Sequence, residues 1–312
     1  MVFQMNLLDG FSDVKTRKSE LLDKMDMLIP WKEWTKIVTP FYKQRGNFGE
    51  QPFPLGTMLR IFVLQNLYDL ADMAVMYEVI EGRSFSKFVG VTDERDVPNG
   101  DTIGRFRNLL EKHNLQEKFF EQVKTLLEQK GLLLKKGTIV DSTIISAPSS
   151  TKNKEKKRDP DAHQVKKGNE WRFGYKAHVG VDSKSKIVHS IVVTAANVHD
   201  VIVAEKLLHG QEETVHGDSG YLGIQKRISN KKIKFKINRR PSQYKKNSLH
   251  SVAQIKHHEH KKSSVRAKVE HVFGVVKKLF GFRKTRYRGL AKQTAKANVM
   301  FALSNLYLCG NA

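Results

Sequence analysis

The run Gly137-Thr138-Ile139-Val140-Asp141-Ser142-Thr143-Ile144-Ile145 decides the fold of this chain. It is rich in β-branched residues, which favour extended strands. Apolar residues before this run recur mainly at helical spacing, whereas strand-like segments dominate directly after it. An aspartate inside an apolar strand is costly to bury unless a cation or another partner compensates its charge. The run therefore predicts both a central strand and a site that uses Asp141.

The change at Gly137 divides the chain into two predicted domains. Residues 1–134 are expected to be mostly helical, with helices that follow Pro30 and Pro54 and a third that Asp101 caps. This domain could carry a helix-turn-helix that recognises DNA ends, or it could serve packing and dimerisation. Its charge is near neutral, which leaves both interpretations open.

Residues 135–312 are expected to form a ribonuclease-H-like α/β domain, in which helices flank a mixed sheet. After the first strand the pattern predicts a hairpin, a helix, a strand, a short helix, a further strand and two closing helices. These elements occupy residues 175–181, 187–194, 200–208, 214–216, 223–228, 232–237, 263–280 and 290–308.

Two segments of the second domain are too polar and basic to pack, so we expect them to form loops. They are residues 147–170 and residues 241–262. The second contains His257, His258 and His260, whose spacing suggests a metal site. The lysines around them favour a solvated loop near DNA instead.

The charge is divided unevenly between the two domains. The chain has a net formal charge of +23: residues 1–134 contain 18 Lys/Arg and 19 Asp/Glu, whereas residues 135–312 contain 37 and 13. A surface this basic attracts phosphate and releases counterions on contact, so we expect double-stranded DNA as the partner. The single Cys309 suits a reducing compartment, and no signal sequence or membrane span is apparent. We therefore expect a cytoplasmic protein associated with the nucleoid.

Three carboxylates lie in this basic half: Asp141, Asp218 in the turn 217–220, and Glu270 in the predicted helix 263–280. Carboxylates that converge from several elements can hold two Mg²⁺ ions for phosphodiester chemistry, and Mn²⁺ could replace Mg²⁺. Helical geometry places Glu270 with Arg266 and Lys277 on one edge, where the cations would reach phosphate. Each residue also has a simpler interpretation: Asp218 as a turn cap, and Glu270 as a surface partner of Arg266.

Further cationic and aromatic residues are candidates for DNA contact. Three lysines alternate with apolar residues over 232–237, which suits a strand that follows a phosphate backbone but also one that protects a sheet edge. Trp171 could stack on an unpaired base or anchor a hairpin. The candidates are Lys232, Lys234, Lys236, Arg239, Arg240, Trp171, Lys156, Lys157, Arg158, Arg283 and Arg286.

Several short segments together resemble the DDE transposases of bacterial insertion sequences, most closely the insertion sequence five family. They are Phe53-Pro54-Leu55, Asp101-Thr102-Ile103, Val140-Asp141-Ser142-Thr143, Lys166-Lys167-Gly168-Asn169, Phe173-Gly174-Tyr175-Lys176-Ala177-His178, Ala196-Asn197-Val198-His199-Asp200, Gly217-Asp218-Ser219-Gly220-Tyr221 and Arg266-x3-Glu270-His271-x-Phe273-Gly274.

This resemblance implies a catalytic and metal-binding triad of Asp141, Asp218 and Glu270, flanked by Arg266 and Lys277. It implies binding of the element's terminal inverted repeats, strand cleavage by water, and attack of the freed 3′-hydroxyl on target DNA, by a homodimer on DNA. One departure matters: Ser263 stands where relatives carry a tyrosine, so the contacts of that tyrosine cannot be transferred. A transposase-derived regulator without catalysis and a ribonuclease-H-like nuclease of other purpose are the alternatives.

Overall fold

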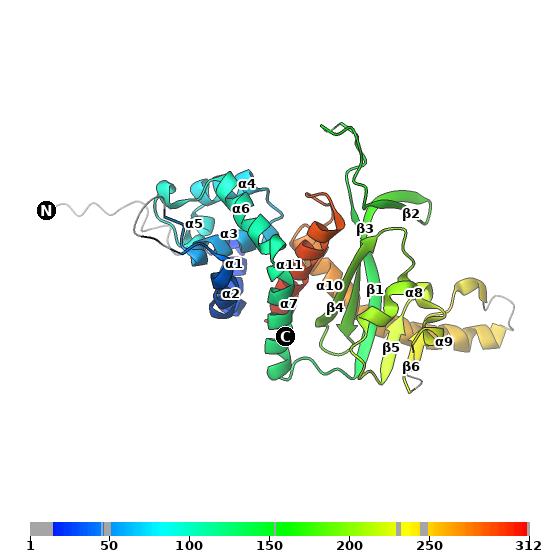
Figure 1. The fold of residues 1–312 in the computed structure, drawn as a ribbon. Helices are drawn as coiled ribbons and strands as arrows, with labels where there is room; N and C mark the ends of the chain where they lie inside the picture. Colours follow the sequence, from blue (N-terminus) through cyan, green and yellow to red (C-terminus); the bar gives the residue numbers. More distant parts are fainter. Residues whose placement is uncertain are drawn as a thin grey trace.

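The protein consists of a helical N-terminal region followed by a mixed sheet flanked by helices (Figure 1). The computed structural model describes residues 15–44, 46, 51–152, 154–228, 232–243 and 249–310. Within these ranges no helix is both long and apolar enough to cross a lipid bilayer.

Seven α-helices lie in the described part of the N-terminal region. Their shared core includes Trp34, whose ring stacks on that of Phe119 with centroids 4.4 Å apart. The apolar repeats after Pro30 and Pro54 correctly predict two of the helices. The helices are α1 Arg17–Leu28, α2 Trp31–Val38, α3 Leu55–Leu67, α4 Asp72–Glu81, α5 Arg83–Val89, α6 Gly100–Lys112 and α7 Leu115–Gln129.

The predicted cap of α6 is wrong by two residues. The side chain of Asn99, not Asp101, accepts a hydrogen bond of 2.8 Å from the backbone N–H of Thr102. Asn99 has extended backbone angles, and Asp101 already lies in the first turn of the helix. Both residue types cap helices well, so composition alone does not distinguish them.

The sheet has six strands and combines antiparallel and parallel pairing. Strand β1 is central: it pairs antiparallel with β3 and parallel with β5. The order is β2-β3-β1-β5-β6, and β4 pairs with β3. The strands are β1 Gly137–Ser146, β2 His163–Lys167, β3 Glu170–Asp182, β4 Val188–Ala195, β5 Thr214–Gly217 and β6 Lys234–Ile237.

The predicted loop 147–170 is wrong in its second half, which forms a β-hairpin. Strand β2 pairs with the start of β3 from His163↔Gly174 to Lys167↔Glu170. Gly168 has a φ of +64°, which permits the tight turn between them. Strand β2 and the start of β3 are mostly exposed. The sequence therefore lacks the alternation of apolar and polar residues that predicts a half-buried strand.

The predicted loop 241–262 is also wrong, because a helix begins at Leu249. Helix α9 runs over Leu249–Arg266, and α10 follows over Lys268–Gly274, so the predicted helix 263–280 is interrupted at Ala267. A π-helical turn, Val275–Leu279, extends α10. Helix α9 is polar on nearly all sides, and a periodicity argument finds only helices with an apolar stripe. Glu259 ties it to the end of β6 by accepting the backbone N–H of Arg239 at 2.9 Å.

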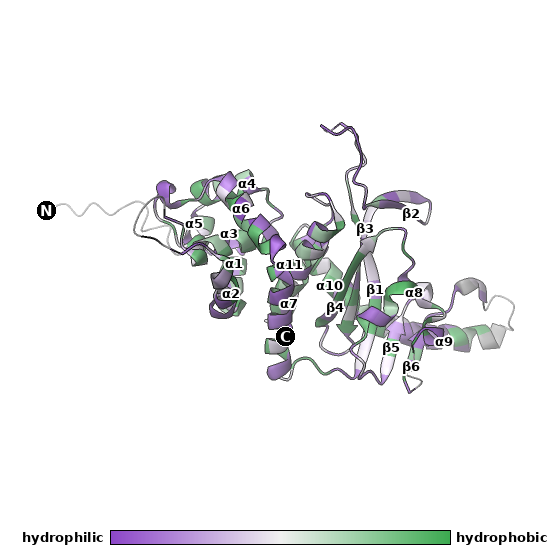
Figure 2. Cartoon of the chain, viewed as in Figure 1, coloured by the Kyte–Doolittle hydropathy of each residue, from purple (hydrophilic) through white to green (hydrophobic). Residues whose placement is uncertain are grey.

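Helices cover both faces of the sheet. Helix α11, Leu290–Cys309, packs against β4 on one face and against α7 of the helical region, so one apolar core spans both regions. The other face is covered by α8, Asp200–Val203, and the 3-10 turn Ala204–Leu207. The predicted helix 223–228 is only a 3-10 turn, Ile224–Lys226. Figure 2 shows mostly apolar residues on β4 and mostly hydrophilic ones on β2.

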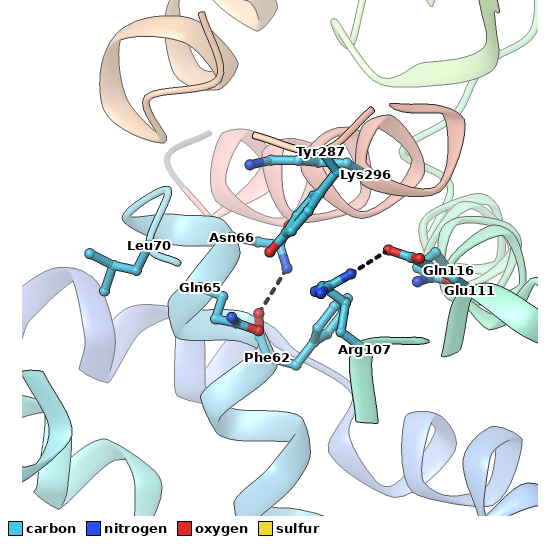
Figure 3. A pocket seen from close by; sticks show the side chains of 9 residues that line it. All are labelled: Phe62, Gln65, Asn66, Leu70, Arg107, Glu111, Gln116, Tyr287 and Lys296. Atoms are coloured by element: carbon cyan, nitrogen blue, oxygen red, sulfur yellow. Dashed lines mark hydrogen bonds and ion pairs between the residues drawn. The ribbon is translucent and has the colours of Figure 1, made fainter. Parts of the chain in front are cut away.

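A polar cluster joins the helical region to the segment before α11 (Figure 3). Arg107 of α6 pairs with Asp72 at 3.0 Å and with Glu111 at 3.1 Å, and its guanidinium lies 4.0 Å from the centre of the Tyr287 ring. Lys296 of α11 pairs with Asp69. These charges are matched within the cluster, which suits a structural junction.

Candidate active site

Asp141 lies in the central strand β1 and is 8% exposed. One carboxylate oxygen accepts the backbone N–H of Ser142 at 2.8 Å. The other accepts a bond of 3.1 Å from Arg266 at the end of α9. The charge of Arg266 thus offsets part of the free energy needed to bury this aspartate among apolar neighbours.

Asp218 follows β5 directly, at the end where β5 runs parallel to β1. The register pairs Val140 with Gly217, so the next residues, Asp141 and Asp218, continue two neighbouring strands. The Asp218 side chain accepts the N–H of Gly220 at 2.8 Å. It therefore caps a turn and lies next to Asp141 of the neighbouring interior strand β1.

Glu270 is exposed in the first turn of α10. Arg266 lies at the end of α9, and the break at Ala267 separates the two residues. The side chain of Arg266 turns to Asp141. The structure thus brings Arg266 to the first carboxylate of the predicted triad.

The charges of Asp218 and Glu270 act on Asp141. Burial, followed by these two charges, raises the pKa of Asp141 to about 6, against the hydrogen bond from Ser142 and the charge of Arg266. In the described residues no three His, Cys, Asp or Glu side chains are already gathered as a metal site. The donors are carboxylate oxygens, which fit Mg²⁺ or Mn²⁺, and their mutual repulsion is what a divalent cation would relieve.

Lys277 lies in the π-helical turn and donates a hydrogen bond of 2.6 Å to the carbonyl of Ile144, near the end of β1. Burial, followed by the charges of Lys167, Arg172 and Arg283, lowers its pKa to about 8. We call Lys167, Arg172, Lys277 and Arg283 the cationic cluster. Sequence reasoning proposed Lys277 and Arg283 but missed the other two as site residues, because only pairing of β2 with β3 brings them there.

The other predicted DNA contacts are placed as follows. Lys234 and Lys236 are exposed in β6, an edge strand, and Lys232 is exposed just before it, while Ile233 and Ile237 are buried. This alternation is as predicted, and it fits both edge protection and phosphate contact.

Arg239 and Arg240 are exposed just after β6, and Lys156, Lys157 and Arg158 are exposed before β2. Trp171 is 67% exposed, so it does not anchor the hairpin by burial. Arg286 pairs with Asp69 of the helical region at 3.2 Å, which assigns it a structural partner. His257, His258 and His260 are exposed on α9.

Sequence reasoning also missed the surroundings of Asp200 at the start of α8. Lys176 of β3 donates to Asp200 at 2.9 Å, and a Cβ atom on Gly220 would lie 3.0 Å from Asp218 Oδ1 and 3.3 Å from Asp200 Oδ2. Lys176 and Asp200 belong to two of the quoted sequence segments, but nothing in the sequence places them next to Asp218.

A mixed sheet with one carboxylate inside its central strand and another directly after the neighbouring parallel strand defines a ribonuclease-H-like enzyme domain. Residues 133–306 match the family described as Transposase DDE domain, which covers more than half of the chain. Residues 11–109 match the family described as Transposase domain (DUF772). The chain therefore belongs to the DDE transposases. No solved structure matches it.

Membership in this family makes the protein a DDE-type transposase, an enzyme that cleaves and transfers phosphodiester bonds. DNA is the partner that a transposase domain implies, and DDE transposases generally use divalent metal ions. The expected helical region and ribonuclease-H-like domain are confirmed.

Proposed function

We propose that the protein is a transposase of the insertion sequence five type, which binds the terminal inverted repeats of its own element, cuts DNA there and transfers the freed end to target DNA. The observation that carries this proposal is the position of Asp218, directly after β5, next to Asp141 of the parallel strand β1, with Arg266 bonded to Asp141 at 3.1 Å and Lys277 bonded to the carbonyl of Ile144 in the same strand. Acids for metal ions and cations for phosphate are the two requirements of phosphoryl transfer.

In this proposal Asp141, Asp218 and Glu270 hold two Mg²⁺ ions. Bound metal ions would activate the attacking oxygen and stabilise the leaving one. Arg266 compensates the charge of Asp141 and would also contact a DNA phosphate. Lys277 adds positive charge near the end of β1. Water first breaks the phosphodiester bond and leaves a 3′-hydroxyl. This hydroxyl then attacks a target phosphodiester, so one bond forms as one breaks and no covalent bond to the protein is needed.

The DNA path would follow the exposed cations. The lysines of β6, Arg239 and Arg240 lie at one edge of the sheet, and the segment 156–158 precedes β2 at the opposite edge. Trp171 is exposed on the hairpin, where it could stack on an unpaired base. Residues 1–134 would form a domain for end recognition or dimerisation, and residues 135–312 the catalytic domain. Two element ends must be paired, so we propose a homodimer on DNA in the bacterial cytoplasm, at the nucleoid.

The test uses the full chain and an oligonucleotide that carries the element's terminal repeat. Asp141→Asn should reduce strand cleavage in Mg²⁺ by about a thousandfold or more while binding of the repeat without metal persists, because charged ligands are needed for the reaction and not for backbone contact. Asp93→Asn, in an exposed ion pair far along the chain from the three acids, is the control.

Cleavage by Asp141→Asn within severalfold of the unaltered protein would overturn the mechanism. Binding without any cleavage by the unaltered protein would favour a regulator instead. Equal cleavage of junctions or RNA–DNA hybrids would favour a nuclease of other purpose.

A further inference from the structure

Asp200 lies beside the proposed active centre and has no role in it so far. It is the first residue of α8, and its side chain is 20% exposed. Its Oδ1 atom accepts a hydrogen bond of 2.9 Å from Lys176 Nζ, which also donates to the carbonyl of Val198 at 2.8 Å. One carboxylate oxygen is therefore fixed by a buried cation.

The other oxygen of Asp200 faces Asp218 across Gly220. A Cβ atom on Gly220 would lie 3.0 Å from Asp218 Oδ1 and 3.3 Å from Asp200 Oδ2, so the same small space separates the two carboxylates. Glycine leaves this space open, whereas any other residue would place a carbon atom within 3.3 Å of both oxygens. Two carboxylate oxygens that face each other across an open space suit a divalent cation.

Two buried polar side chains lie close to these carboxylates. Tyr221 is fully buried, and among the described residues its hydroxyl has no hydrogen-bond partner. Burial raises its pKa, and the charges of Asp200, Asp141 and Asp218 raise it further, so its side chain lies among three acids.

His178 is the second of these side chains and is also fully buried. Its Nε2 atom contacts Thr194 at 2.9 Å. Its Nδ1 atom lies 3.6 Å from Asp200 Oδ1 and has no hydrogen-bond partner in the part of the chain that the structure describes. Unmatched polar atoms at such depth are rare and point to a further component of the site.

We propose that Asp200 is a fourth carboxylate of the active centre, and that its Oδ2 atom shares a divalent cation with Asp218. Asp218 then neighbours Asp141 through the β1–β5 register and Asp200 across Gly220, so it could serve as a ligand common to two ions. Lys176 is a positioning residue: it holds Oδ1 and leaves Oδ2 turned toward Asp218. This inference rests on the proposed function and deepens it, because it adds a ligand to the same site.

The experiment measures Mn²⁺ binding to the full chain without DNA, by titration with detection of free Mn²⁺ by electron paramagnetic resonance. Asp200→Asn keeps an oxygen for Lys176 but loses the charge, and it should weaken the affinity for one ion at least tenfold. Gly220→Ala fills the space between the two carboxylates and should weaken it at least threefold without changing any charge. Gly56→Ala, where an added Cβ meets no atom within 4 Å, is the matched control and should change nothing.

A third variant separates ligation from a purely structural role. Asp200→Cys in a Cys309→Ser background should shift the preference of the site from Mn²⁺ toward Cd²⁺, because thiolates prefer softer ions. A structural role would not alter this preference. Melting temperatures of all variants identify any loss of folding. If Asp200→Asn does not fold, the Mn²⁺ affinity of Gly220→Ala decides whether Asp200 is a ligand.

The outcomes distinguish this inference from the proposed function. If Asp218→Asn loses Mn²⁺ while Asp200→Asn and Gly220→Ala stay within twofold of the unaltered protein, Asp200 is not a ligand and only this inference fails. If neither the unaltered protein nor any variant binds Mn²⁺, the proposed metal-dependent function fails with it.

Discussion

Asp72 in the helical region and Asp141 in the sheet are both aspartates with an arginine partner, yet their protonation equilibria shift in opposite directions. Burial alone would raise the pKa of Asp72, but hydrogen bonds from Arg107 and Gln65 lower it overall. At Asp141 burial is joined by the charges of Asp218 and Glu270, and the pKa rises to about 6 despite Arg266. The surroundings of Asp72 favour its charged form, whereas the surroundings of Asp141 favour its neutral form.

The same contrast applies to the cations of the two regions. Arg60 of α3 donates to Asp26 and to the carbonyl of Phe88, within the helical region. Lys277 instead lies among Lys167, Arg172 and Arg283, whose charges lower its pKa. Paired opposite charges within the helical region compensate one another. Charges of one sign that lie close together repel, and a bound ligand of opposite charge reduces that repulsion.

The largest expected effect tests the matched charges of the helical region. Arg107→Met removes one partner from Asp72 and Glu111 and should lower the free energy of unfolding by about 3–5 kcal/mol, because partly buried carboxylates remain uncompensated. Urea unfolding measures this. Arg95→Met breaks the exposed pair with Asp93 and should leave the unfolding curve unchanged. Equal curves for Arg107→Met and the unaltered protein would contradict a structural role for the cluster.

The next effect tests the opposed charges of the active centre. The folded state raises the pKa of Asp141, so this group stabilises folding only while it is protonated, and that stability is lost as the pH rises from about 4 to about 6. In chelator at pH 8, Asp141→Asn should therefore raise the free energy of unfolding by roughly 2–3 kcal/mol. The gain should shrink below pH 6 and when Mg²⁺ is added, because Mg²⁺ stabilises only the ionised aspartate.

Stability curves at pH 5 and pH 8, with and without Mg²⁺, provide the measurement. Asp72→Asn is the matched comparison, since its pKa is lowered and its charge should stabilise the protein at pH 8. A loss of stability for Asp141→Asn in chelator would show that the two aspartates have the same role.

A smaller effect concerns the cationic cluster and DNA. The double variant Lys167→Glu, Arg172→Glu should weaken binding of terminal-repeat DNA by about tenfold to a hundredfold. The number of phosphate charges that the protein neutralises, read from the salt dependence of the affinity, should fall by about two or more. Gel shifts at several salt concentrations measure both. The matched control, Lys87→Glu with Lys112→Glu, alters two exposed lysines of the helical region. A loss as large in the control would mean that the helical region carries the DNA contacts.

The smallest expected effect concerns Trp171. Trp171→Ala should weaken binding to DNA with an unpaired flank by about 1 kcal/mol and leave binding to blunt duplex unchanged, because stacking requires an exposed base face. Trp171→Phe retains an aromatic ring and should recover most of the affinity. Equal losses on both DNAs would assign Trp171 a role in the shape of the hairpin.

The sequence by itself determined the elements whose signal is local. The β-branched run around Asp141 became the central strand, and the apolar repeats became α2, α3 and α11. The basic character of the second half and the three carboxylates could also be predicted, since charge is additive along the chain. A ribonuclease-H-like order of elements followed from these signals.

Only the tertiary structure decided the features that depend on pairing or on distant neighbours. The hairpin of β2 and β3 and the polar helix α9 carry no apolar periodicity, so local pattern could not reveal them. The meeting of Lys176, Asp200 and Gly220 joins residues from a strand, a helix start and a turn. Folding set the direction of each aspartate's pKa, because that direction depends on which charges from other elements surround the carboxylate.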